Sequence, residues 1–541
     1  MGTAIGTRRR KHWGWGYEDA QPSRADLERA APGIRERLGF GGEVVEEHVP
    51  LEAIELPAPR LDPPQALATI VSADPHERVS HAYGRAYRDV VRAFRGRIEN
   101  PPDLVARPRD EVDIEAVLEW CTDAGAAAIP YGGGTSVVGG VEPRVGDSYA
   151  GAVTVDLGAL DRVLEVDVMS RAARIQAGAT GPGLEDQLRA EGLTLRHFPQ
   201  SFEFSTLGGW IATRAGGHFA TLYTHIDDLV ESVRALTPSG IWESRRLPGS
   251  GAGPSPDRLL LGSEGILGVI TEAWVRVHER PRWKASCGVA FDDFASGAEA
   301  VRELSQSGLY PTNCRLLDEA ESALTHAGPE GKAMLVLGFE SAHHPVDQPM
   351  RLAVECTADH GGQPGEVKGR AERKDPVGAW RHAFLAAPYL RDTFVACGVL
   401  SDTFETAITW DRFADFHARV TETARRAVSE ASGAPLAGPG SARLSCRFTH
   451  VYPDGPAPYY TVLAPARRGS ELEQWDEVKA AVSAAVIDGG GTITHHHAVG
   501  RDHRPWYDRQ RPDPFAEALR AAKRAVDPTA TLNPGVLVDP A

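Results

Sequence analysis

The sequence feature that most constrains the fold is a glycine-rich loop that directly follows a short apolar segment. The loop reads PYGGGTSVVGG, residues 130–140, and the segment before it reads AAAI. Glycine has no Cβ and adopts positive φ freely, so successive backbone N–H groups can point into one concavity and bind phosphate oxygens. The hydroxyls of Thr135 and Ser136 add hydrogen-bond donors. We therefore expect a pyrophosphate to bind in this loop.

The spacing of the glycines disfavours the two best-known phosphate loops. Val137 stands where the GxGxxG dinucleotide fingerprint requires its third glycine. Ala333 follows the Gly-Lys pair at residues 331–332, where a Walker loop requires Ser or Thr. Taken alone, the loop could also be a structural turn without a ligand.

Length and composition indicate a folded protein of several units. The chain has 541 residues, more than one hydrophobic core usually supports, with 42% hydrophobic and 24% charged residues. Its formal net charge of −16 argues against nucleic acid as a partner, because nucleic-acid binding needs a basic surface. An anionic substrate would therefore have to meet a local cluster of arginines.

Cysteine usage and the chain ends favour a cytoplasmic protein. The six cysteines are scattered and form no CxxC pair, so we expect neither a zinc site nor a disulfide framework. No apolar run approaches the ~20 residues of a membrane span, and the basic start RRRKHWGWG lacks the apolar core of a signal peptide. The ending VDPA is not an SKL-type peroxisomal signal.

The pattern along the chain predicts an α+β protein in four parts. Residues 1–98 form an N-terminal extension of helical stretches joined by proline-rich connections, and residues 99–281 alternate strands and helices with glycine turns. Residues 282–490 alternate β-like runs with long helices, which is typical of an antiparallel sheet covered by helices. Residues 491–541 form a C-terminal segment that carries GTITHHHAVG, a helical stretch and LNPGVL, and the pattern leaves its partner domain undecided.

Two later segments combine with the glycine loop into a recognisable order. EFSTLGGWIATRAGG, residues 203–217, and LLLGSEGILGVITEAWVRV, residues 259–277, follow PYGGGTSV along the chain. This order resembles the FAD-binding domain of the vanillyl-alcohol oxidase and p-cresol methylhydroxylase superfamily. The resemblance implies a FAD-binding domain of two subdomains followed by a cap domain. It places these residues at the cofactor: Pro130, Gly132, Gly133, Gly134, Thr135, Ser136, Thr206, Gly209, Thr213, Glu264 and Ile270.

The same resemblance bears on how FAD is held. Members that attach the flavin covalently often carry a histidine immediately after the paired glycines. In this chain Thr135 and Ser136 take that place, so we expect FAD to be bound without a covalent link.

One branch of the superfamily, the alkyldihydroxyacetonephosphate synthases, resembles nearly the whole chain. WGWGYED, residues 13–19, is typical of that branch, although it could also be an aromatic cluster that packs the extension onto the body. RHFPQSFEFSTLGGW resembles the passage that leads from a histidine to the flavin-contacting strand, which puts His197 at an active-site position.

The resemblance also suggests residues of the substrate channel. Arg315 in NCRLLD, and Arg391 and Thr403 in YLRDTFVACGVLSDTF, stand where the synthases carry channel residues. Arginine suits a phosphate because its planar, permanently charged fork forms two parallel hydrogen bonds. Ion pairs on the surface are the alternative interpretation.

Candidate catalytic groups lie near the end of the chain. Tyr459 aligns with a synthase tyrosine that assists proton movement, with Tyr460 as the alternative one residue away. The run His495, His496 and His497 in GTITHHHAVG resembles the SHHHGVG of the synthases. If this segment is a strand, alternate side chains face opposite sides, so the three imidazoles would not share one metal ion. We expect no metal.

The resemblance implies a reaction without net oxidation. The acyl group of acyl-dihydroxyacetone phosphate is exchanged for a long-chain alcohol, with the flavin N5 as nucleophile at the substrate C1. The ending LNPGVL is closer to that of FAD-linked oxidases and dehydrogenases of 2-hydroxy acids such as lactate or glycolate, so an oxidoreductase is the alternative. Family resemblance alone suggests a homodimer and a peripheral contact with a membrane.

Overall fold

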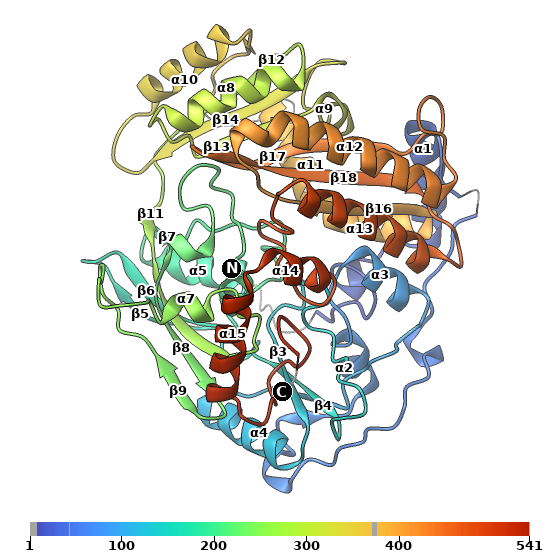
Figure 1. The fold of residues 1–541 in the computed structure, drawn as a ribbon, viewed down its shortest axis with the longest axis vertical. Coiled ribbons are helices and arrows are strands. Elements are labelled where there is room, and N and C mark those ends of the chain that lie inside the picture. Colours follow the sequence, from blue (N-terminus) through green and yellow to red (C-terminus); the bar gives the residue numbers. More distant parts are fainter. Residues whose placement is uncertain (1–7, 43, 370–375, 540–541) are drawn as a thin grey trace.

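The structure is a computed structural model that describes residues 8–42, 44–369 and 376–539. Two sheets of a lower body and one large sheet of an upper body dominate the view in Figure 1, and the C-terminal helices lie against the lower body. This arrangement confirms the expected α+β class.

The N-terminal extension wraps along both bodies. Residues 8–17 come first, and helix α1 then begins behind a capping box in which Ser23 accepts from the Asp26 N–H and Asp26 accepts in return. The helical elements of the extension are α1 (Arg24–Leu38), α2 (Pro75–Ser80), α3 (Tyr87–Phe94) and the 3-10 turns Glu18–Ala20, Leu51–Ala53 and Gln65–Leu67.

The FAD-binding domain contains two sheets. The first has the order β1-β2-β4-β3, in which β4 pairs in parallel with β2 and with β3. The N-terminal extension contributes β1 (Val71–Ser72) to this sheet, and the domain itself contributes β2 (Leu104–Ala106), β3 (Ala127–Tyr131) and β4 (Ala152–Asp156), with α4 (Glu111–Asp123) between β2 and β3. Parallel strands need such a crossover helix, and the buried run AAIPY of β3 delivers the glycine loop at its carboxyl end.

The second sheet of this domain is antiparallel, with the order β5-β6-β10-β8-β9. Its strands are β5 (Val163–Asp167), β6 (Ala172–Gln176), β8 (Val230–Thr237), β9 (Gly240–Glu243) and β10 (Val269–Arg276). The remaining elements are α5 (Gly181–Ala190), β7 (Leu193–Thr194), α6 (Leu207–Thr213), the 3-10 turn Ile226–Asp228, α7 (Asp257–Leu260) and β11 (His278–Glu279), which pairs with β7.

The cap domain is built on a seven-stranded antiparallel sheet with the order β15-β12-β14-β13-β17-β18-β16. Its strands are β12 (Trp283–Phe291), β13 (Asn313–Leu317), β14 (Ala333–Ser341), β15 (Gln363–Pro364), β16 (Val399–Glu405), β17 (Arg443–Tyr452) and β18 (Gly455–Pro465). Its helices are α8 (Phe294–Gln306), α9 (Glu319–Thr325), α10 (Asp347–Asp359), α11 (Pro376–Ala396), α12 (Trp410–Ser432) and α13 (Glu471–Asp488).

The two faces of the cap sheet differ in what covers them. On one face Phe294 of α8 and Phe413 of α12 pack edge-on against Phe448 of β17. On the other face Trp380 of α11 stacks with Phe384 and lies beneath the guanidinium of Arg315. The second face is the one that carries polar groups toward the FAD-binding domain.

The C-terminal segment belongs with the FAD-binding domain in space. Helices α14 (Arg504–Gln510) and α15 (Asp513–Val526) precede a bridge in which Leu532 pairs in parallel with Ala128 of β3. Buried Lys523 holds this end through Asp527 and the Leu532 carbonyl. The sequence pattern alone had left the partner of this segment undecided.

One local expectation was wrong, because the middle flavin motif forms the short helix α6 where a strand was expected. The histidine run, for which a strand was only one possibility, is an irregular loop. The aromatic interpretation of WGWGYED is confirmed, because Trp15 packs edge-on against Phe204 of the body, while Trp13 packs edge-on against Phe94 within the extension. Among the described residues, no helix is long and apolar enough to cross a membrane.

Candidate flavin and active site

The glycine loop is a close-fitting backbone cradle. A Cβ on Gly132 would lie 2.3 Å from the Thr206 hydroxyl, and one on Gly133 would lie 1.9 Å from the Phe204 carbonyl oxygen. Gly134 has φ of +64°, the left-handed region that glycine adopts most easily. Larger residues would therefore not fit at these positions.

The backbone N–H groups of residues 132–137 donate no hydrogen bond within the described part of the chain. Unpaired donors of this kind need a partner, and consecutive N–H groups along a turn form an anion-binding nest. The unpaired N–H groups therefore suit the pyrophosphate of FAD, and this structural observation supports the sequence motif independently.

The fold brings all three flavin motifs to this cradle. Thr206 caps α6 by accepting from the Gly209 N–H, and its hydroxyl lies against Gly132. Gly265 lies against the Pro130 ring, and the Glu264 carboxylate lies close to Gly140. The motifs are thus neighbours in space, as a common ligand requires.

Two of the predicted cofactor residues, Thr213 and Ile270, do not contact the glycine loop through their side chains in the described structure. Ile270 is buried in the apolar core of the second sheet, and Thr213 donates its hydroxyl to the Gly209 carbonyl within α6. No described contact joins either side chain to the glycine loop, so their contact with the cofactor stays a prediction.

Glu264 links the FAD-binding domain to the C-terminal loop. Its carboxylate accepts hydrogen bonds from the Val499 and Gly500 N–H groups at 2.9 and 2.8 Å. Burial raises the pKa of Glu264 to about 7, although the two N–H groups oppose the shift. The carboxylate therefore positions the end of the histidine loop beside the cofactor cradle.

A row of polar side chains crosses the cap sheet on its second face. Tyr459 of β18 pairs with Glu405 of β16 on one side and with Arg447 of β17 on the other. The Arg447 guanidinium lies 4.1 Å above the Tyr459 ring, and the Tyr459 hydroxyl donates to Thr403 at 3.1 Å. Burial raises the pKa of Tyr459, and the nearby positive charge of Arg447 opposes the rise.

Tyr460 points to the opposite face. Its hydroxyl meets His417 of α12 at 2.9 Å and its ring stacks on Phe404. Successive side chains of a strand alternate between faces, so only Tyr459 can reach the histidine loop.

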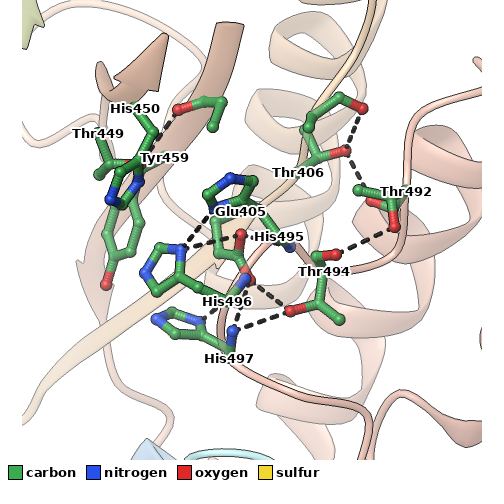
Figure 2. Close-up of polar contacts among 12 residues, drawn as sticks. Glu405, Thr406, Thr449, His450, Tyr459, Thr492, Thr494, His495, His496 and His497 are labelled. Atoms are coloured by element: carbon green, nitrogen blue, oxygen red, sulfur yellow. Dashed lines mark hydrogen bonds and ion pairs between the residues drawn. The ribbon is translucent and has the colours of Figure 1, made fainter. Parts of the chain in front are cut away.

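The histidine loop is folded around the buried carboxylate of Glu405, as Figure 2 shows. The N–H groups of His495, His496 and His497 all donate to this carboxylate, at 2.7, 3.2 and 3.0 Å. The Thr494 hydroxyl donates to it as well. Glu405 therefore fixes the backbone of all three candidate catalytic residues.

Electrostatics favour a charged Glu405 beside neutral imidazoles. Burial tends to raise the pKa of Glu405, but the positive charge that the three imidazoles carry when protonated, and the hydrogen bond from the Thr494 hydroxyl, lower it well below its usual range. Burial lowers the pKa of His495, His496 and His497. Neutral imidazoles keep lone pairs with which to accept protons.

A wider imidazole cluster surrounds the first two histidines. His450 donates through Nε2 to the Gly217 carbonyl, which leaves its buried Nδ1 without a partner among the described residues. His495 lies between Tyr452, at 2.7 Å from its Nε2, and His496, at 3.1 Å between the two Nδ1 atoms. His225 donates to the His495 carbonyl.

The alternation that argued against a shared metal does not apply to a loop. Ligand atoms of His450, His495 and His496 lie within 4.8 Å of one another, a spacing that one transition-metal ion can bridge. His497 is not part of this group.

The predicted substrate residues converge on the same face. Arg315 is 4% exposed and has no carboxylate partner in the described chain, where its Nη1 donates to Asn313 and its Nε is unpaired. Burial lowers the pKa of Arg315 to about 10, and Arg447 adds to the effect. Arg391 donates to the Arg85 carbonyl at 2.7 Å, and its buried Nε is also unpaired.

His197 is buried under the same region. Both of its ring nitrogens lack a partner among the described residues, and burial lowers its pKa to about 3. An imidazole kept neutral with two unused polar atoms is suited to contact a ligand.

Sequence reasoning missed four polar residues of the site: Glu405, Arg447, His450 and His225. Glu405 lies two positions after the predicted Thr403, so the period of a strand could have placed it on the same face. His450 begins HVYPDGPAPYY, residues 450–460, the segment that contains Tyr459. No local signal distinguishes Arg447 or His225 from structural residues.

Comparisons with known proteins agree with this geometry. Residues 102–244 match the family described as FAD binding domain, and residues 280–537 match FAD linked oxidases, C-terminal domain. The alkyldihydroxyacetonephosphate synthase of Dictyostelium discoideum is 29% identical over 85% of this chain and 77% of its own length. That of Caenorhabditis elegans is 31% identical over 85% of this chain and 80% of its own.

A solved structure extends the likeness to the fold. An alkyldihydroxyacetonephosphate synthase structure superposes with a TM-score of 0.79 at 25% identity, covering 97% of this chain and 98% of the other. The cofactor is therefore FAD, for which the glycine cradle supplies the unpaired donors. The chain belongs to the alkyldihydroxyacetonephosphate synthase family of FAD-binding enzymes.

Proposed function

We propose that this protein is an alkyldihydroxyacetonephosphate synthase-like transferase of ether-lipid synthesis. It exchanges the acyl group of acyl-dihydroxyacetone phosphate for a fatty alcohol and releases a fatty acid, with no net oxidation. Family membership supports this reaction over oxidation of a 2-hydroxy acid.

The observation that carries the proposal is the pair of cap arginines without carboxylate partners. Buried cations are normally paired, because removing a charge from water is costly. Arg315 and Arg391 have no carboxylate partner in the described chain and lie near Tyr459 and the imidazoles. A substrate phosphate would supply the missing negative charge.

The side chains of the site have separate roles in substrate binding and in proton transfer. Arg315 and Arg391 bind and orient the phosphate, with Thr403 and His197 as further substrate contacts. Tyr459 and the three histidines of the loop move the proton beside the substrate carbonyl and assist departure of the carboxylate. Bound FAD would supply a nucleophilic ring nitrogen for the displacement at C1.

A paired spectroscopic and product assay tests this assignment. Under anaerobic conditions without an electron acceptor, labelled fatty alcohol and acyl-dihydroxyacetone phosphate should yield a labelled ether lipid while the flavin spectrum stays oxidised at the end. Bleaching of the flavin by lactate or glycolate, with no ether product, would instead identify a 2-hydroxy-acid oxidoreductase.

The remaining assignments belong to the same proposal. The chain divides into an extension (1–98), a FAD-binding domain (99–281), a cap (282–490) and a C-terminal segment (491–541), with dissociable FAD and no resident metal. We place the enzyme in the cytoplasm, as a homodimer in peripheral contact with a membrane that holds its lipid substrates.

A further inference from the structure

Residues 8–17, here named the strap, close over the cofactor cradle. The guanidinium of Arg10 donates through Nη1 to the Gly133 carbonyl at 2.9 Å and lies 4.4 Å above the Phe204 ring. Gly133 is the central glycine of the cradle, and Phe204 is the second residue of the second flavin motif. The extension therefore reaches the cofactor site directly.

Hydrogen bonds and an ion pair fix the strap to α2 and to α11. His76 donates to the Arg10 carbonyl at 3.0 Å, and Lys11 forms a buried ion pair with Asp392 of α11 at 2.8 Å. The Trp15 N–H donates to the same carboxylate at 2.9 Å. Arg10 is thus placed by the strap and is not a freely moving surface side chain.

Arg10 lacks the negative partner that a buried guanidinium needs. Its Nη2 is buried without a hydrogen-bond partner, and no ion pair joins it to a carboxylate in the described chain. Asp156, the carboxylate that acts on it electrostatically, already pairs with His81 and Arg107 at 3.1 and 3.2 Å.

A second unpaired arginine lies at the other end of the loop. The Arg85 N–H donates to the Ser136 carbonyl at 2.6 Å. Among the residues that the structure describes, its side chain, which is 5% exposed, donates only to the Gly84 and Tyr83 carbonyls, and its buried Nε has no partner. Both guanidiniums act electrostatically on the Tyr131 hydroxyl, which lies against Gly134.

We propose that Arg10 of the strap, together with Arg85, completes the cofactor site: the two guanidiniums would neutralise the two negative charges of the FAD pyrophosphate. Two buried like charges beside six unpaired N–H groups form a site for a dianion. The phosphate group of the substrate is the alternative ligand that could occupy this site. We favour the cofactor because both arginines bond to carbonyls of the glycine loop itself.

The test compares flavins that differ in phosphate. The dissociation constants of FAD and riboflavin are measured on flavin-free protein for wild type, Arg10→Gln and Arg9→Gln. Arg9 is the matched control, because it is adjacent on the strap but pairs with Glu18 at a solvent-exposed position. Arg10→Gln should raise the constant for FAD at least tenfold and leave riboflavin unchanged, and Arg9→Gln should change neither. Arg10→Lys should recover part of the loss.

Three results would overturn the proposal. Equal weakening of FAD and riboflavin would mean that Arg10 only supports the fold. If Arg10→Gln leaves the dissociation constant of FAD unchanged but raises the KM for the phosphate substrate, then Arg10 binds the substrate phosphate and not the cofactor. The third result comes from the wild-type protein alone, as the dissociation constants of FAD and riboflavin at increasing salt concentration. If salt weakens the binding of FAD no more than that of riboflavin, the two arginines do not neutralise the pyrophosphate.

Discussion

Tyr459 and Tyr460 are neighbours in β18 but face opposite sides of the cap sheet. Tyr459→Phe removes only the hydroxyl beside Thr403, so we expect kcat to fall by about 100-fold or more, the range of a lost general acid or base. The flavin absorption spectrum should not change. Tyr460→Phe is the matched control.

For Tyr460→Phe we expect kcat within about twofold of wild type, because its hydroxyl contacts His417 and Cys446 on the helix-covered face of the sheet and not the histidine loop. The free energy of unfolding should fall by about 1 kcal/mol from the lost hydrogen bond. Equal losses of kcat in the two variants would contradict the assignment of Tyr459.

The imidazole cluster predicts a distinct response to metals. His450, His495 and His496 could be bridged by one ion, but the proposed reaction needs their lone pairs free for protons. Dialysis against EDTA should therefore leave kcat unchanged, and added Zn²⁺ should inhibit. Loss of activity with EDTA that Zn²⁺ restores would instead show that the site requires a metal.

At the scale of elements, the histidine loop depends on one carboxylate of β16. Glu405→Gln removes the charge that accepts three backbone N–H groups, so we expect turnover to fall at least about tenfold and unfolding free energy by about 1–3 kcal/mol. Glu299→Gln, an exposed glutamate of α8, is the control.

The stability effect of Glu405→Gln should depend on pH in a defined direction. The folded pKa of Glu405 lies far below the unfolded value of about 4.3, so its contribution is complete above that pH and is lost as pH falls toward the folded pKa. Thermal unfolding should show a constant difference between wild type and variant at neutral pH that narrows below about pH 4. A difference that grows on acidification would contradict this account.

The regular elements were largely predictable because their patterns are local. Amphipathic α4 and the apolar runs that became β3, β4 and β14 follow from hydrophobic periodicity. The histidine loop was not predictable, because its shape is set by Glu405, which lies about ninety residues earlier in the chain. Likewise, the pairing of Leu532 with β3 depends on a contact between distant segments.

At the scale of the whole molecule, the cap and the FAD-binding domain are joined through buried polar links. The Lys11–Asp392 pair joins the strap to α11, and Glu264 and Glu405 hold the two ends of the histidine loop from different domains. These links predict that release of FAD and unfolding of the cap are coupled.

A ligand that binds only the folded state stabilises it in proportion to its occupancy, by about 2.7 kcal/mol at one hundred times its Kd. Saturation with FAD should therefore raise one common unfolding temperature, reported alike by flavin fluorescence and by far-ultraviolet circular dichroism. Flavin release well below the temperature at which the helices melt would show that the domains act independently.

The central claim is that the alcohol displaces the acyl group at C1 of a phosphate substrate on FAD-loaded protein. Turnover with ¹⁸O-labelled fatty alcohol, without an electron acceptor, tests it most directly by mass spectrometry of both products. The account predicts the label in the ether lipid and an unlabelled fatty acid in equal amount. Label in a fatty ester, or a product formed only when an electron acceptor is supplied, would contradict it.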